Sequence, residues 1–116
     1  MKILICGPEG SGKTSLAKPL AELLNAQYVN KDTYAVELRG YVDGLVAAGK
    51  IVVIDKRCNN ADAVEYLSPD YVIWMDTVDS STEKPSTVNY HVAKWFDDTH
   101  AQLVDIVQTY MKRNNL

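Results

Sequence analysis

The residues best suited to chemistry form the stretch GPEGSGKTS at positions 7–15. It satisfies the Walker A pattern G-x-x-x-x-G-K-[ST], in which glycines let successive backbone N–H groups turn toward an anion. The helix expected after it directs its positive end to the same point. The Lys13 ammonium is expected to reach the β- and γ-phosphates of ATP, and the Thr14 hydroxyl to bind Mg²⁺. The predicted nucleotide-binding residues are Gly7, Glu9, Gly10, Ser11, Gly12, Lys13, Thr14 and Ser15.

A carboxylate that can complete this site ends the apolar run IVVID at residues 51–55. Asp55 occupies the position of the carboxylate in a Walker B strand, which holds the magnesium shell. An aspartate at the end of a strand can also do no more than cap the following turn. Because a complete Walker A loop lies upstream, we favour the magnesium role and predict Thr14 and Asp55 as the metal ligands.

Alternating strand and helix patterns must position these residues, and this alternation predicts an α/β domain. Short apolar runs predict strands at residues 2–6, 26–29, 51–55, 71–76 and 88–95. Helical spacing predicts helices at residues 13–24, 32–48 and 97–113, and a short one that ends near residue 68.

The first predicted helix has two notable features. Pro19 lies within it, removes a backbone donor and pushes against the carbonyl of Ser15, so we expect a kink or a distinct first turn. Its leucines recur at helical spacing, which predicts a buried face made of Leu16, Leu20, Leu23 and Leu24. Gly49 is expected to end the second helix.

The overall composition limits the kind of protein. A length of 116 residues fits a single domain at residues 1–116. The net charge of −3 and the pI near 5.2 argue against a broad nucleic-acid-binding face. No run is apolar and long enough for a membrane span or a signal peptide, so we expect a cytoplasmic protein. Cys6 and Cys58 are expected to be reduced thiols, a disulfide between them stays open, and their spacing gives no metal motif.

A family resemblance covers nearly the whole chain. In order, the segments GPEGSGKTS, VNKDTY, IVVID, PDYVIWMDT and YHVAKW resemble the adenylylsulfate-kinase-like group of small P-loop kinases, including short versions in phage genomes. The resemblance implies a three-layer α/β/α P-loop NTPase fold with a mainly parallel five-stranded sheet in the order 2-3-1-4-5. It also implies transfer of the γ-phosphate of ATP to a small hydroxyl-bearing acceptor.

Two further residues enter the predicted catalytic set beside Lys13. In adenylylsulfate kinases an aspartate at the end of strand two contacts the acceptor, and in polynucleotide 5′-hydroxyl kinases a similar N-[KR]-D segment carries the catalytic base. Asp32 matches both patterns, and an attacking hydroxyl needs an acceptor for its proton. The alternative is that Asp32 only caps the second helix. Arg57 or Lys56 is placed to hold an anionic group of the acceptor, or is simply an exposed charge.

Departures from the family pattern keep three functions open. The loop at residues 77–87, where related kinases carry a lid, contains no arginine. We favour a kinase, with a nucleotide-binding regulatory module as the alternative and a polynucleotide kinase, disfavoured by the acidic charge, as the second alternative. Arg57 or a neighbouring subunit of a homodimer would have to supply the missing cation. The sequence identifies neither the acceptor nor the preference for ATP over GTP.

Overall fold

A computed structural model of the chain describes residues 1–7, 12–30, 35–55, 67–75, 88–92 and 99–114. Its elements in chain order are β1 (Lys2–Cys6), α1 (Lys13–Leu23), β2 (Gln27–Val29), α2 (Ala35–Ala47), β3 (Val52–Asp55), β4 (Tyr71–Met75), β5 (Tyr90–Val92) and α4 (Thr99–Arg113). The predicted order of these elements is therefore confirmed, whereas the predicted short helix that ends near residue 68 falls largely on residues 56–66, outside the described residues. The observed strand β5 is shorter than the predicted strand at residues 88–95, of which residues 93–95 lie outside the described residues.

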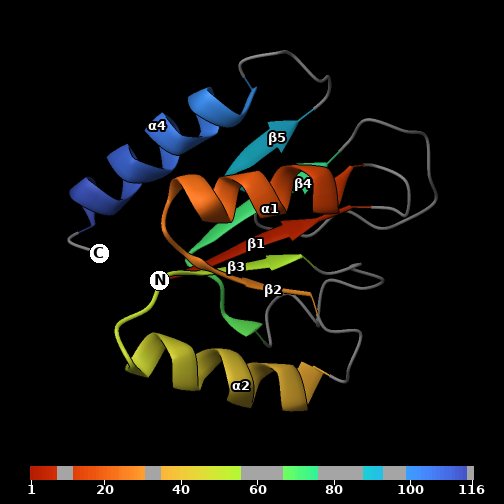
Figure 1. Cartoon of the computed structure of the whole chain (residues 1–116), viewed down its shortest axis with the longest axis vertical. Helices are drawn as coiled ribbons and strands as arrows, with labels where there is room; N and C mark the ends of the chain where they lie inside the picture. Colours follow the sequence, from red (N-terminus) through yellow and green to blue (C-terminus); the bar gives the residue numbers. More distant parts are fainter. Residues whose placement is uncertain (8–11, 31–34, 56–66, 76–87, 93–98, 115–116) are drawn as a thin grey trace.

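The five strands form one parallel sheet in the order β2-β3-β1-β4-β5, as the family resemblance implied. The central strands β1, β3 and β4 are buried at every residue, because helices cover both faces of the sheet. Near-continuous apolar runs are the sequence form of such strands. All five strands run the same way, so their carboxyl ends meet at one edge (Figure 1).

Side chains that alternate along each strand divide the core into two clusters. Ile3 and Ile5 of β1 pack with residues of α1 and α4 on one face of the sheet. Leu4 of β1 packs with α2 on the other face. The result is a three-layer α/β/α arrangement, with α1 and α4 on one side and α2 on the other (Figure 1).

The buried face of α1 differs from the predicted one. Leu16, Leu20 and Leu24 are buried, but Leu23 is 57% exposed, so its assignment to the core was wrong. Each residue advances about 100° around a helix, and the buried alanines of α1 extend the apolar stripe on the side away from Leu23. The two alanines are Ala17 and Ala21. The leucine spacing alone places Leu23 within the buried face of α1. The two alanines move the centre of that face away from Leu23.

Both helices that lead into the β2–β3 half of the sheet end in the same way. After α1, Asn25 adopts a left-handed φ of 53°, and the Ala26 N–H donates to the Ala21 carbonyl at 2.8 Å. After α2, Gly49 has a φ of 84°, and the Lys50 N–H donates to the Leu45 carbonyl at 3.1 Å. Both are Schellman motifs, which reverse the chain from helix to strand. The predicted stop at Gly49 is confirmed.

Candidate active site

The start of α1 lies at the carboxyl edge of the sheet and is built to meet an anion. Its N-cap is Gly12, whose φ of 94° suits glycine, and the Gly12 carbonyl accepts the first helical hydrogen bond from the Leu16 N–H at 3.0 Å. In the part of the chain that the structure describes, no side chain caps this end and no acidic residue lies in the first turn. The positive end of the helix dipole therefore lies where a phosphate bound by the Walker A loop would be. The uninterrupted helix Lys13–Leu23 contains Pro19, and the expected kink or distinct first turn stays a prediction.

The two predicted metal ligands meet at this edge. The Thr14 Oγ1 hydroxyl donates a hydrogen bond of 2.6 Å to Oδ2 of Asp55. The register of β1 against β3 pairs Ile5 with Asp55, which brings the end of β3 level with the exit of β1 into the phosphate loop. Asp55 is only 4% exposed. Residues 41 positions apart thus form one oxygen-lined site, although their role as metal ligands stays a prediction.

Tyr28 is a site residue that the sequence analysis missed. Its hydroxyl donates a second hydrogen bond, of 2.9 Å, to the same Oδ2 atom of Asp55. Burial and the neighbouring Asp55 carboxylate raise the pKa of Tyr28 above its ordinary value of 10.0, while hydrogen bonds with the side chains of Asn30 and Thr14 act in the opposite direction. The Lys18 ammonium of α1 lies 5.8 Å from the centroid of the Tyr28 ring.

A signal for Tyr28 existed in the sequence once the strand order was known. The sheet pairs β2 with β3, with Tyr28 opposite Val53. Because side chains alternate along a strand, Val53 and Asp55 face the same side, and Tyr28 faces it with them. A tyrosine beside the predicted Walker B strand, on the face of its aspartate, was therefore a candidate partner.

The remaining predicted site residues divide into two groups. Lys13 and Ser15 lie in the first turn of α1, and Gly7 directly follows β1, so the structure places them around the Thr14–Asp55 contact. The others lie outside the described residues, namely Glu9, Gly10, Ser11, Asp32, Lys56 and Arg57. Cys58 does too, whereas Cys6 is buried and its thiol donates to the Ile73 carbonyl at 3.8 Å.

The donor set at this edge fits magnesium. A hydroxyl oxygen and a carboxylate are hard oxygen ligands, and Mg²⁺ in nucleotide sites takes one or two carboxylates together with substrate phosphates. Within the described ranges no group of three or more His, Cys, Asp or Glu side chains could hold a metal ion by itself.

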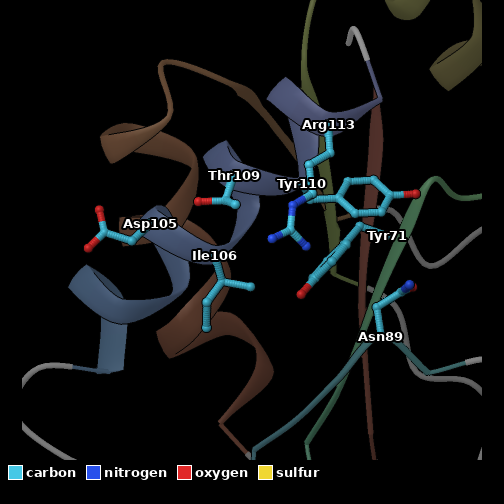
Figure 2. Close-up of a pocket in the computed structure, with 7 residues that line it drawn as sticks. All are labelled: Tyr71, Asn89, Asp105, Ile106, Thr109, Tyr110 and Arg113. Carbon is cyan, nitrogen blue, oxygen red and sulfur yellow. The ribbon is translucent and has the colours of Figure 1, made fainter.

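A hollow lies at the opposite edge of the sheet from the Thr14–Asp55 contact. It has a volume of about 420 Å³ and opens between α4 and the amino ends of β4 and β5 (Figure 2). Tyr71 and Tyr110 meet edge to face in its wall, with ring centroids 4.9 Å apart, and the Tyr110 hydroxyl donates to the Asp70 carbonyl at 2.8 Å. Burial is the largest cause that raises the pKa of Tyr71. Since parallel sheets bind ligands at their carboxyl edge, this hollow is separate from the phosphate site.

Comparisons with known proteins agree with this architecture. A family model described as an AAA domain matches residues 3–111. The structure is similar to the APS kinase of Mycobacterium tuberculosis, with a TM-score of 0.72, 17% identity, and coverage of 92% of this chain and 96% of that one. It is also similar to the shikimate kinase of Acinetobacter baumannii in complex with shikimate, with a TM-score of 0.56, 16% identity, and coverage of 99% and 94%. These likenesses confirm the predicted P-loop NTPase fold.

A curated sequence relative comes from a different kind of protein. The chain is 31% identical over 86 residues to the ATP-binding subunit ClpX 2 of the ATP-dependent Clp protease of Wolinella succinogenes. The match covers 74% of this chain and 21% of that protein, so the chain spans about a fifth of the length of this relative. Among the described residues, no helix has both the length and the apolar character needed to cross a membrane.

Proposed function

Since the chain belongs to the AAA domain family, we propose that it is an ATP-dependent phosphotransferase that moves the γ-phosphate of ATP·Mg to a small hydroxyl-bearing acceptor. The observation that carries this proposal is the contact between Thr14 and the buried Asp55 at the start of α1. Residues 1–116 form the kinase-like domain. A Walker A loop that merely resembled a phosphate site would not need a buried carboxylate at its threonine.

The described residues divide the work at the triphosphate. The N–H groups at the start of α1 bind and orient the phosphates, and the Lys13 ammonium neutralises charge on their β and γ oxygens. Thr14 and Asp55 would hold Mg²⁺, which supplies further neutralisation of the charge that develops on the transferred group. Positioning and charge stabilisation are the main contributions of protein groups in phosphoryl transfer.

The acceptor is proposed to bind beyond β2 and β3. These strands are neighbours in the sheet and end at Val29 and Asp55. Asp32 follows Val29 by three residues and Arg57 follows Asp55 by two, which span at most about 11 and 7 Å of chain. Both residues are therefore within reach of the carboxyl edge of the sheet along the chain. We propose Asp32 as the base that takes the acceptor's proton, and Arg57 as the cation that binds an anionic group.

The similar structures support an acceptor that is small. Those compared above are described as an APS kinase and a shikimate kinase, and another similar structure is a gluconokinase of Sinorhizobium meliloti. The curated relative supports a second candidate, because it is described as an ATP-binding subunit of a protease. In that case the chain would bind nucleotide and report its presence to a partner protein, with little transfer.

A radiolabel assay separates these functions. The chain is incubated with γ-labelled ATP, Mg²⁺ and a panel that contains adenylylsulfate, shikimate, gluconate, nucleosides and a 5′-hydroxyl oligonucleotide. We expect label on one small acceptor. In Lys13→Ala we expect the rate of transfer to fall by about 100-fold or more, because the ammonium that binds the phosphates is removed. Lys112→Ala, which removes an exposed lysine of α4, is the matched control and should retain full activity. Nucleotide binding without any labelled acceptor would favour the regulatory module.

A further inference from the structure

The Asp55 carboxylate is held by hydroxyl groups. Two hydroxyls donate to its Oδ2 atom, Thr14 Oγ1 at 2.6 Å and the Tyr28 hydroxyl at 2.9 Å. Among the described residues, no hydrogen bond reaches Oδ1. A buried carboxylate needs such donors, since it is 4% exposed and has little access to water. The described contacts therefore anchor Asp55 through Oδ2.

Thr14 can keep its hydrogen bond to Asp55 while it binds a metal. A hydroxyl has one proton to donate and two lone pairs to offer, so donation to Oδ2 leaves a lone pair for a cation. Its position then depends on the cation as well as on the carboxylate. Tyr28 has no such second task, which makes its hydrogen bond the more constant anchor of Asp55.

Tyr28 is itself well fixed. Its backbone pairs with Val53 of β3, and its ring packs against the core cluster beneath α1. The Lys18 ammonium lies within cation–π range of the ring. A tyrosine has few rotatable bonds, so a ring held from several sides presents its hydroxyl at a defined point.

We propose that Tyr28 is a positioning residue for the magnesium site, whose hydroxyl holds Asp55 in the orientation that leaves Oδ1 to the metal shell. This inference rests on the proposed function, because it assigns magnesium to Thr14 and Asp55. Groups that hydrogen-bond to the ligands of a metal orient those ligands, and their loss costs about 10- to 100-fold in metal affinity. In this role Tyr28 acts through its hydrogen bond to Asp55.

The test measures the affinity for a non-hydrolysable ATP analogue as a function of Mg²⁺ concentration. In Tyr28→Phe we expect the Mg²⁺ midpoint to rise by about tenfold, whereas the affinity for the analogue in EDTA stays that of the wild type. Tyr110→Phe is the matched control, because it removes a tyrosine hydrogen bond of 2.8 Å at the opposite edge of the sheet. This control loses stability without moving the Mg²⁺ midpoint.

A second variant provides an independent test in case Tyr28→Phe does not fold. Lys18→Met keeps the Tyr28 hydroxyl but removes the exposed cation from its ring, and it should raise the midpoint by about two- to fivefold. A wild-type midpoint in both Tyr28→Phe and Lys18→Met would overturn the inference and leave the proposed function standing. A wild-type chain whose nucleotide affinity does not respond to Mg²⁺ would overturn both.

Discussion

Lys2 provides the sharpest test of how the amino edge of the sheet is held together. Its ammonium donates to the Leu67 carbonyl at 2.6 Å and to Asp43 of α2 at 2.9 Å. The Lys2 side chain is 11% exposed, whereas the Asp43 side chain is 44% exposed. Lys2→Met keeps most of the length of the side chain and removes both contacts. We expect it to lower the free energy of unfolding.

The magnitude follows from the burial of the two partners. The contact with the buried Leu67 carbonyl counts most, because an unsatisfied buried acceptor costs about 1–3 kcal/mol. Asp43 can regain water and keeps its ion pair with Arg39 at 3.3 Å, so its part is discounted to below about 1 kcal/mol. The expected loss at pH 7 is thus about 1–3 kcal/mol, with the Leu67 carbonyl dominant.

The smaller contribution to this loss, that of the Lys2–Asp43 ion pair, depends on pH in a defined direction. The hydrogen bond from Lys2 is the largest cause that lowers the pKa of Asp43 below its ordinary value of 3.8. A carboxyl whose pKa is lower in the folded state stabilises the fold above its unfolded pKa, and this contribution is lost as the pH falls through the folded pKa. The difference in free energy of unfolding between wild type and Lys2→Met should therefore become smaller as the pH falls from 7 to about 3. It should not reach zero, because the contact with the Leu67 carbonyl remains.

Urea unfolding followed by tryptophan fluorescence at both pH values measures this gap. Lys112→Met makes the same chemical change at an exposed position of α4 and should stay within about 0.5 kcal/mol of the wild type. The reasoning fails if Lys2→Met is as stable as Lys112→Met at pH 7, or if the gap widens in acid.

Two further predictions concern the helices, and both use urea unfolding at pH 7. Leu20→Ala, in the buried face of α1, should cost about 2–5 kcal/mol, whereas Leu23→Ala should change stability by less than about 0.5 kcal/mol because Leu23 is 57% exposed. Equal losses would contradict the corrected face of α1. Gly49→Ala should destabilise by about 1 kcal/mol because its φ is 84°, while Gly40→Ala, within α2 and with open space at its Cβ position, should stabilise by a similar amount. A stabilising Gly49→Ala would show that the left-handed turn is not required.

The sequence predicted the fold well because its strongest patterns reflect burial. The runs IVVI and YVIWM are apolar at every position because β3 and β4 lie between two helix layers, and such runs are typical of parallel strands that are buried on both faces. The strand order came from the family resemblance, since nothing in the pattern of one strand names its neighbour. Leu23 was misplaced because the leucine spacing ignored the two buried alanines of α1.

The site was predicted only where a motif fixes it. The Walker A and Walker B patterns predicted that Thr14 and Asp55 would work together, and the structure brings them into contact. Tyr28 belongs to no motif, and its place beside Asp55 depends on the pairing of β2 with β3. A residue that acts through a tertiary contact can be predicted only when the order of the strands and the face of each side chain are both known.

The carboxylates at the two edges of the sheet have different kinds of partner. At the amino edge, Asp43 meets the cations of Lys2 and Arg39, so its charge is balanced within the chain. At the carboxyl edge, the hydrogen bonds that the structure gives to Asp55 come from two neutral hydroxyls. Hydroxyls hold a buried carboxylate without cancelling its charge. These two hydroxyl contacts fit the magnesium role proposed for Asp55, whereas the capping role concerns a turn that lies outside the described residues.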